Sequence, residues 1–210
     1  MARYIGPVCR LCRREGTKLF LKGEKCFNAC VLEKGKRKSA PGMHIKQRIK
    51  VTEYGRRLRE KQKTKRIAGL TEEQFRHYFE RAERLPGLTG ENLLRLLETR
   101  LDNVTKRLGF ALSMAHARQL VLHGHVRVND KRVDVPSYAV QPGDRIALSE
   151  KAKQNVAVQQ ALQAIQKRGP LPSWIEVSAS HAAGKVRGWP SRDEMSYPID
   201  EQLIVELYSK

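Results

Sequence analysis

Four cysteines are the residues whose type and spacing point most directly to chemistry, and all lie within the first thirty positions. Cys9, Cys12, Cys26 and Cys30 form the pattern Cys-x2-Cys-x13-Cys-x3-Cys. Two short chelating turns can bring four soft thiolates to one tetrahedral metal ion, and a segment this short and basic lacks an apolar core of its own. We therefore expect a structural zinc site. A four-iron four-sulfur cluster stays open as an alternative because it also takes four thiolates.

Two other interpretations of the cysteines are weaker. A pair of disulfides is disfavoured by the reducing cytosol, and a redox Cys-x-x-Cys motif would not need the second pair of cysteines.

Residues 113–135 predict a helix followed by a β-hairpin. Ser113 is a good helix N-cap, and Gly124 supplies the left-handed residue that ends the helix. Alternating valines then predict two strands, at 126–128 and 133–135, joined by a tight turn at Asn129-Asp130. A two-residue turn of this kind fixes which side chains face each other across the hairpin.

The predicted register places two like charges opposite each other. Arg127 faces Arg132 on the outer side of the hairpin, and we expect Arg118 and Lys131 to lie close by. Like charges in directly opposed positions repel. Such a cluster is unfavourable alone and favourable beside a polyanion, which predicts a nucleic-acid surface.

The net charge supports the same interpretation. The chain has 41 Lys and Arg against 22 Asp and Glu, a net charge of +19. Residues 1–66 hold 21 Lys and Arg against 5 Asp and Glu, whereas the remainder holds 20 against 17. A field so concentrated favours a polyanionic partner because counterion release drives binding to phosphates. An acidic membrane is the rival partner, but aromatic residues make up only 6% of the chain and no amphipathic aromatic face is evident.

The elements that must position these residues form an α+β protein. A cation-dense helix is expected from Thr52-Glu53 through Arg66, and a capping box at Thr71–Gln74 opens another. An apolar stripe from Thr89 to Leu108 predicts one long helix. Further elements are a helix at 154–167 and strand-like segments at 145–148, 174–177 and 203–207. We expect a metal-pinned basic N-terminal arm at 1–45, a helical subdomain at 46–98 completed by 156–210, and an inserted α+β subdomain at 99–155.

No strong enzyme motif is present. The chain lacks a phosphate-binding loop, a Gly-x-Ser-x-Gly elbow and a His-Glu-x-x-His motif. His123 and His125 could pass for a metal pair, but the cysteines already offer four ligands, so contact with RNA or solvent is the expected role. Asp102 and Asn103 lie within an apolar helix pattern and are expected to make a buried polar contact. No apolar run reaches the length of a membrane span and no signal-peptide core follows Met1, so we expect cytoplasmic residence.

Several segments carry a family resemblance. Ala117-Arg-Gln-Leu-Val, His123-Gly-His-Val and Val128-Asn129 resemble the alpha-L RNA-binding motif. Met1-Ala-Arg-Tyr-Ile-Gly-Pro-Val-Cys-Arg-Leu-Cys, Arg100-Leu-Asp-Asn-Val and Glu201-Gln-Leu-Ile-Val-Glu-Leu-Tyr-Ser-Lys appear in order around it. Together with Ala40-Pro-Gly-Met-His, Leu58-Arg-Glu-Lys-Gln-Lys and Glu73-Gln-Phe-Arg, they resemble the family of bacterial small-subunit ribosomal protein four, in its four-cysteine form. Asp130 stands where that family commonly has a turn glycine.

The resemblance implies a non-enzymatic structural protein of the small ribosomal subunit in the cytoplasm. Such a protein binds small-subunit rRNA early in assembly, contacts ribosomal protein five, contributes to translational accuracy and lies where mRNA enters the ribosome. Some family members repress translation of their own message. No membrane and no small-molecule substrate are implied. The alternatives are an RNA-modifying or tRNA-associated protein that uses an alpha-L motif, for which the 55 residues after Asn155 leave little catalytic room, and a zinc-dependent DNA regulator.

The basic residues and histidines expected to contact RNA are spread over the arm, the cationic helix and the hairpin. They are Arg3, Arg10, Arg13, Arg14, Lys36, Arg37, Lys38, His44, Lys46, Arg48, Arg56, Arg57, Arg59, Lys61, Lys63, Lys65, Arg66, Arg118, His123, His125, Arg127, Lys131 and Arg132.

Overall fold

The structure is a computed structural model, and it describes residues 3–34, 39–42, 50, 52–166, 171–178, 182–195 and 198–209. The chain divides into two compact units. Met1–Leu93 and Tyr197–Lys210 form the first, here called the helical unit, and Leu94–Ser196 form the second, here called the sheet unit. The expected α+β class is confirmed, because helices occur with one five-stranded antiparallel sheet.

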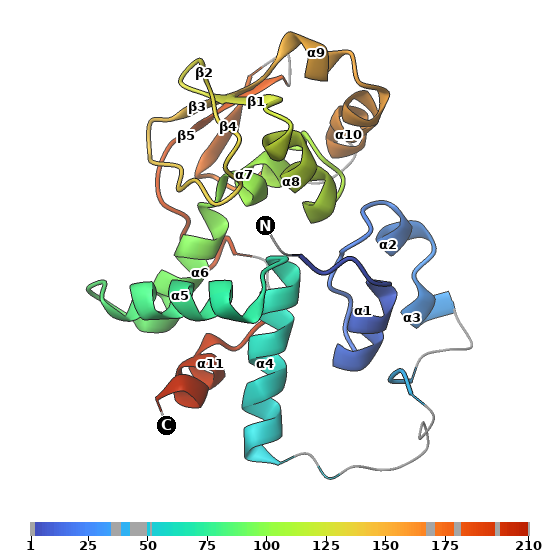
Figure 1. The fold of residues 1–210 in the computed structure, drawn as a ribbon, viewed down its shortest axis with the longest axis vertical. Coiled ribbons are helices and arrows are strands. Elements are labelled where there is room, and N and C mark those ends of the chain that lie inside the picture. Colours follow the sequence, from blue (N-terminus) through green and yellow to red (C-terminus); the bar gives the residue numbers. More distant parts are fainter. Residues whose placement is uncertain are drawn as a thin grey trace. The chain divides into compact units, whose positions relative to one another are not determined.

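The helical unit begins with three short helices and continues with longer ones, which Figure 1 shows from blue to teal and in red. Their bounds are α1 Cys9–Glu15, α2 Lys25–Asn28, α3 Val31–Lys34, α4 Glu53–Ile67, α5 Glu72–Glu83 and α11 Glu201–Tyr208, with α6 Thr89–Glu98 crossing into the sheet unit.

Side-chain caps begin two of these helices, as the sequence predicts. The Thr52 hydroxyl accepts a hydrogen bond from the backbone N–H of Gly55 at 3.1 Å, which begins α4. Thr71 and Gln74 form the expected capping box of α5. Its Phe75 and Phe79 are buried in the core of the helical unit.

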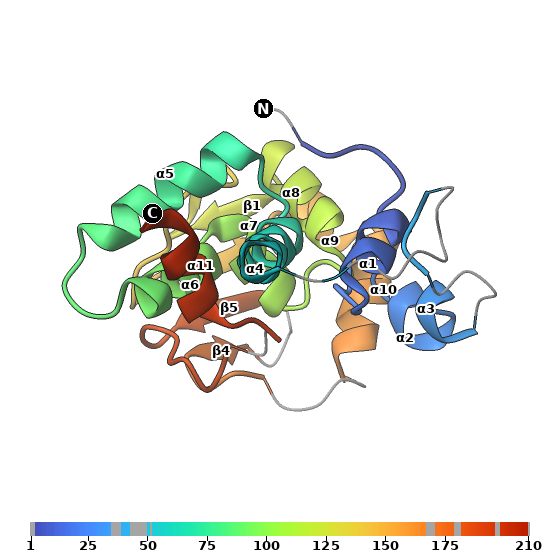
Figure 2. The same cartoon turned by 90° about the horizontal axis from the view of Figure 1, so that it is seen from below.

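The expected strand at 203–207 is wrong, because this segment is the helix α11. Asp200 caps it by accepting a hydrogen bond from the N–H of Gln202 at 3.1 Å, and Ile204 is fully buried. The ring of Tyr208 stacks on Phe79, with 4.3 Å between the centroids. Figure 2 views α4 end-on, with α11 beside it. A helix buries this apolar face against α4 and α5, whereas an isolated strand would have no partner in the unit.

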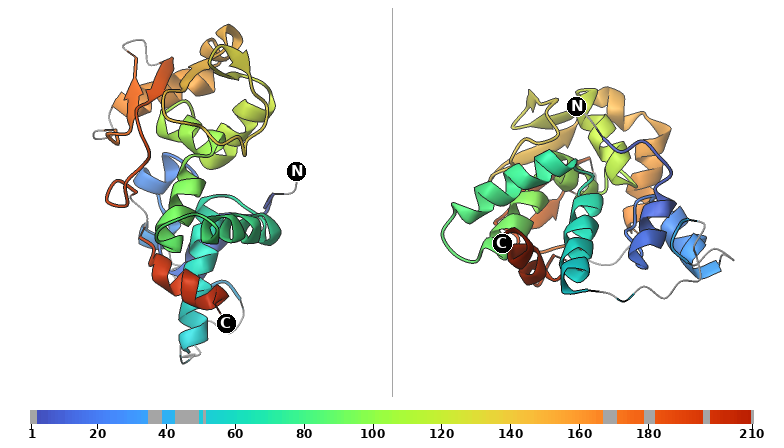
Figure 3. Two further views of the ribbon diagram at one scale, coloured as in Figure 1. Left: turned by 90° about the vertical axis from the view of Figure 1, so that its left-hand side faces the viewer. Right: turned by 60° about the horizontal axis from the view of Figure 1, so that its bottom comes forward.

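The sheet unit places two helices, α7 and α8, against one face of its sheet (Figures 1 and 3). The strands run in the order β2-β1-β3-β5-β4, and inward-facing Val, Ile and Leu side chains pack against α7 and α8 in one core. The bounds are α7 Leu101–Arg107, α8 Met114–Leu122, β1 Val126–Val128, β2 Lys131–Arg132, β3 Arg145–Leu148, α9 Glu150–Lys153, α10 Val156–Gln166, β4 Ile175–Val177 and β5 Ala183–Val186.

Residues 156–195 belong to the sheet unit, which differs from the expected subdomain boundaries. The strand β5 pairs with β3 on one side and with β4 on the other, so it satisfies the backbone groups along the otherwise free edge of β3. Only the last segment, which contains α11, completes the helical unit.

The single helix expected from Thr89 to Leu108 is two helices, α6 and α7, separated at Thr99-Arg100. Arg100 adopts an extended backbone and forms an isolated bridge with Ala139. The N–H of Val140 donates to the carbonyl of Thr99 at 2.9 Å, and the N–H of Leu101 donates to the carbonyl of Tyr138 at 2.9 Å. These long-range bonds replace helical ones, while the apolar stripe continues on both helices.

Candidate nucleic-acid interface

The hairpin formed by β1 and β2 confirms the predicted opposition of two arginines. Arg127 is paired with Arg132 in the register, and Val128 with Lys131. Asn129 and Asp130 have φ values of 49° and 64°, the left-handed conformations that a tight two-residue turn requires. The second strand covers only residues 131–132 and does not extend over 133–135 as expected.

The turn is fastened to the neighbouring strand by a side-chain network. The amide of Asn129 donates to a carboxylate oxygen of Asp144 at 2.8 Å, and its carbonyl oxygen accepts from the N–H of Arg145 at 2.9 Å. The other oxygen of Asp144 accepts from the N–H of Gln141 at 2.8 Å. The hairpin therefore holds its cations on a rigid base. The sequence does not predict this network, because no local pattern links residues fifteen positions apart.

The hairpin cations have no acidic neutraliser in the described part of the chain. Arg127, Lys131 and Arg132 are exposed, and none of the described carboxylates lies within 4.0 Å of their charged groups. A Cβ placed on Gly124 would lie only 2.1 Å from Nε of Arg132. The Arg132 side chain thus lies directly over the end of α8, where the helix dipole favours a cation.

Arg118, which we expected to lie close to the hairpin cations, is buried and is not exposed as they are. It is 5% exposed and its Nη1 lies 3.3 Å from the carboxylate of Asp102, which also pairs with Arg100 at 2.6 Å. Arg118 is one position from Ala117 on the buried face of α8, and Asp102 offers it a charge partner there. The expected buried polar contact of Asp102 and Asn103 is confirmed, since Asn103 donates to Glu98 at 2.7 Å.

His123 and His125 flank Gly124 at the start of the hairpin. Their rings lie edge to face, with 6.1 Å between the centroids. His123 is exposed and His125 is partly buried.

The cations of α4 form ion pairs within the protein, in contrast to those of the hairpin. All seven form ion pairs with described carboxylates. The pairs are Arg56–Glu53, Arg57–Glu206, Arg59–Glu15, Lys61–Glu72, Lys63–Glu60, Lys65–Glu72 and Arg66–Glu15. The seven cations share five carboxylates, because Glu15 and Glu72 each pair with two of them. The pairs relieve part of the repulsion within α4, and contact of this helix with rRNA stays a prediction.

Glu15 is the central carboxylate of this network. Its side chain is fully buried at the end of α1 and pairs with both Arg59 and Arg66 of α4. This contact connects the cysteine-bearing segment to the longest helix of the helical unit.

The cysteine segment folds around a small core of its own. Cys12, Leu19 and Cys26 are buried, and all four cysteines are free thiols. The N–H of Lys22 donates to the sulfur of Cys26 at 3.2 Å. Burial raises the pKa of the Cys12 thiol, and the three other cysteines are close enough to add to that shift.

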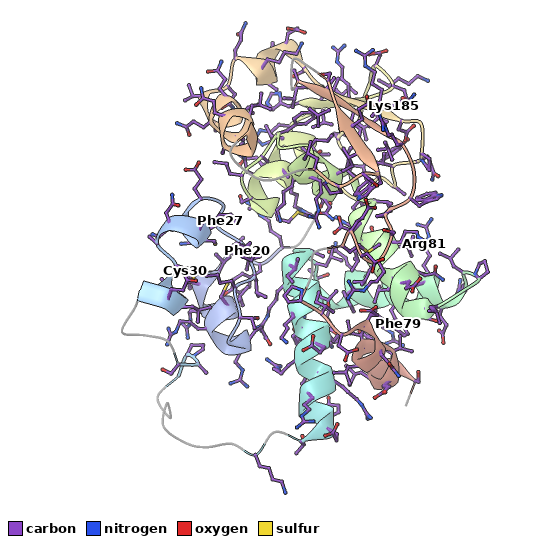
Figure 4. All side chains as sticks on the ribbon, turned by 180° about the vertical axis from the view of Figure 1, so that it is seen from behind. Phe20, Phe27, Cys30, Phe79, Arg81 and Lys185 are labelled. Atoms are coloured by element: carbon purple, nitrogen blue, oxygen red, sulfur yellow. The ribbon has the colours of Figure 1, made fainter. Side chains whose placement is uncertain are left out.

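The described residues do not show the expected metal-binding arrangement of the N-terminal arm. Across the described residues, no three His, Cys, Asp or Glu side chains are gathered tightly enough to hold a metal ion. The rings of Phe20 and Phe27 pack against each other at a tilt, with 5.0 Å between their centroids, and Figure 4 shows them close to Cys30.

The other expected contacts in the arm are partly described. Arg3, Arg10 and Arg14 are exposed, and Nε of Arg13 donates to the carbonyl of Ser39 at 2.9 Å. Lys36, Arg37, Lys38, His44, Lys46 and Arg48 lie outside the described residues.

Two exposed cations on the sheet were missed by the sequence analysis. Arg145 and Lys185 face each other across β3 and β5. The alternation of 145–148 could have placed Arg145 outward, but β5 itself was not expected. Separately, the helices in the described ranges include none with the length and apolar character needed to cross a bilayer.

Comparison with known proteins covers the chain from end to end. A family model described as "Ribosomal protein S4/S9 N-terminal domain" matches residues 3–98, and one described as "S4 domain" matches residues 99–146. The chain is 54% identical to small ribosomal subunit protein uS4 of Pelotomaculum thermopropionicum and 53% identical to that of Citrifermentans bemidjiense. Both alignments cover the full length of both chains. The two matched regions include the cationic helix α4 and the β1–β2 hairpin, and together with the full-length identities they show that the chain belongs to the uS4 family of ribosomal proteins.

Proposed function

We propose that this protein is a structural, non-enzymatic constituent of the small ribosomal subunit in the cytoplasm, where it binds rRNA. The observation that carries the proposal is sequence similarity over the full length of the chain. More than half of the aligned residues are identical to those of proteins named for the small ribosomal subunit. The hairpin adds a physical reason, because Arg127 and Arg132 oppose each other without a described acid to neutralise them.

The mechanism is phosphate neutralisation on a preformed surface. Cations held in repulsion release free energy when phosphates approach, and displaced counterions add an entropic gain. The Asn129–Asp144 hydrogen bond fixes the hairpin, so less ordering is required on binding. Exposed cations on a sheet surface suit phosphates, so shape and backbone recognition of folded RNA are favoured.

Co-sedimentation tests this function. The protein should remain with small ribosomal subunits through a high-salt wash, and structured small-subunit rRNA should compete far better than duplex DNA. Release at moderate salt, or equal competition by duplex DNA, would contradict the proposal and favour a DNA-binding role.

The proposal extends to a place in assembly and decoding. We infer that the protein binds rRNA early and nucleates assembly, contacts ribosomal protein five, lies near the incoming mRNA and contributes to translational accuracy. Repression of its own message would use the same cationic surface. Reconstitution without the protein tests this inference: later proteins should fail to assemble, and assembly at the normal rate would contradict it.

Zinc bound by Cys9, Cys12, Cys26 and Cys30 is part of the same proposal. The donor set suits a soft ion, and Cys26 already receives a backbone hydrogen bond. Zinc bound by the four sulfurs would crosslink α1 to the segment around α2. Metal analysis and proteolysis of residues 1–40 with and without chelator test it. Equal proteolysis would contradict a structural metal, and a brown iron–sulfur chromophore would identify the alternative cluster.

A further inference from the structure

The outer face of the sheet carries a second pair of opposed like charges. Arg145 on β3 and Lys185 on β5 are partners in the register, as Arg127 and Arg132 are on β1 and β2. All four side chains are exposed. Directly opposed like charges destabilise a sheet, so two such pairs on one face are unfavourable for the free protein.

Small residues separate the two pairs. Ala147 lies opposite Arg127 on one side and opposite Ala183 on the other. The alternate residues, including Ile146 and Val186, point into the core against α7 and α8. The outer face therefore has a floor of short side chains bordered by four cations, which allows a backbone to approach closely.

Acidic residues offset this field only at one edge, where Arg187 and, more weakly, Lys185 lower the pKa of the Glu176 carboxyl. Arg145 and Lys185 form no ion pair within 4.0 Å with any described carboxylate. Glu176 on β4 lies opposite Lys185, but its carboxylate is bound by Arg187 at 3.0 Å. Glu176 thus marks the edge of the cationic face. Asp130 and Asp134 in the hairpin are exposed and likewise form no described ion pair with these cations.

We propose that the outer face of the sheet, from β2 to β5, is one continuous phosphate-binding surface on which Arg145 and Lys185 extend the hairpin site to a double-helical segment of rRNA. This rests on the proposed function and adds residues to it. The four strands span roughly 14 Å at the usual spacing between neighbours, which is wide enough for several phosphates of one strand. Lys185, which Figure 4 labels, lies on β5.

The full-length R145Q/K185Q variant tests this surface through the salt dependence of rRNA binding. We expect the slope of log affinity against log salt to fall by about 0.9 per cation, and affinity at moderate salt to fall about tenfold. The matched control is K151Q/K153Q, which removes two cations from α9 of the same unit and should leave the slope nearly unchanged.

A second variant keeps the test informative if glutamine substitutions perturb the fold. Ala147→Glu places an acid in the floor and should weaken rRNA binding more than Ala157→Glu, at an exposed position of α10. Thermal melting should show R145Q/K185Q to be as stable as the wild type or slightly more stable, because repulsion is relieved.

The outcomes separate this inference from the proposed function. An unchanged slope for R145Q/K185Q beside a lowered slope for R127Q/R132Q would overturn the extended surface and leave the ribosomal role intact. Absence of salt-dependent rRNA binding by the wild type would overturn both. Normal rRNA binding by R145Q/K185Q with reduced recruitment of a neighbouring acidic protein would overturn the inference and identify a protein interface.

Discussion

Helix α4 and the β1–β2 hairpin both concentrate cations, but only those of α4 form ion pairs with described carboxylates. All seven basic residues of α4 pair with described carboxylates, and two of these cations share the buried Glu15. The hairpin instead opposes Arg127 and Arg132 without such a pair. Charge density alone therefore does not identify a binding surface: in α4 much of it holds the fold together, whereas in the hairpin it stays available to a ligand.

The largest expected effect is on folding and comes from the α4 network. Glu15→Gln removes a buried carboxylate from between Arg59 and Arg66, whose side chains are only 30% and 19% exposed. Breaking one side of such a pair should lower the free energy of unfolding by about 2–3 kcal/mol, as measured by urea denaturation. Limited proteolysis should accelerate within α1, where Glu15 anchors the cysteine segment.

Glu53→Gln is the matched control on the same network. Glu53 and Arg56 are 67% and 62% exposed, so their loss should change stability by less than about 0.5 kcal/mol. Equal stability of the two variants would refute the structural role of the network. The salt slope of rRNA binding by folded E15Q should not fall, since the substitution leaves every cation in place.

Tyr208 gives a pH-dependent test of the same packed corner. Burial, reinforced by the Glu72 carboxylate, raises the pKa of Tyr208 to about 12. The fold therefore favours the neutral hydroxyl, and this stabilisation is fully present below the unfolded pKa near 10 and is lost as pH rises through 12.

Tyr208→Phe should remove that alkaline loss. Relative to the wild type, the variant should gain ~2 kcal/mol in unfolding free energy between pH 10 and 12, with little difference at neutral pH. Denaturant melts across this range measure the difference. Parallel stability curves for the two proteins would show that Tyr208 ionises as freely in the fold as in the unfolded chain.

The hairpin should show the opposite pattern from α4. R127Q/R132Q removes opposed cations, so the free protein should keep or slightly raise its melting temperature. Its affinity for rRNA should fall about tenfold at moderate salt, with a shallower salt slope. If R127Q/R132Q lost stability but bound rRNA as tightly as the wild type, the hairpin cations would serve the fold and not the ligand, which would contradict the contrast with α4.

Local features were predictable from the sequence, because the chemistry involves residues a few positions apart. Ser113 accepts from the N–H of His116 at 3.3 Å, Thr71 and Gln74 cap α5, and the Asn129-Asp130 turn has the expected positive φ values. The turn then fixes the Arg127–Arg132 opposition. The core of the candidate site was therefore within reach of the sequence.

Non-local features were not predictable in this way. The pairing of Arg66 with Glu15 spans 51 positions, and the buried pairing of Arg118 with Asp102 spans 16. The apolar residues at 203–207 are compatible with either a strand or a helix. The helix is favoured because it lets Tyr208 at its end stack on Phe79. The strand β5 was missed because Ala183-Gly-Lys-Val has weak strand propensity and forms only between two partners.

The smallest expected effect concerns the turn that aligns the hairpin cations. Asp130 has a φ of 64°, a conformation that glycine adopts without strain and aspartate only tolerates. Asp130→Gly should raise the free energy of unfolding by a few tenths of a kcal/mol up to about 1 kcal/mol, less the added entropy of the unfolded chain.

Asp130→Asn separates charge from conformation, because it removes the same negative charge while keeping the Cβ. If both variants tighten rRNA binding equally but only Asp130→Gly is more stable, the turn stores backbone strain and the acid opposes phosphates. A stability gain shared by Asp130→Asn would instead assign the effect to charge, so the turn conformation would no longer explain it.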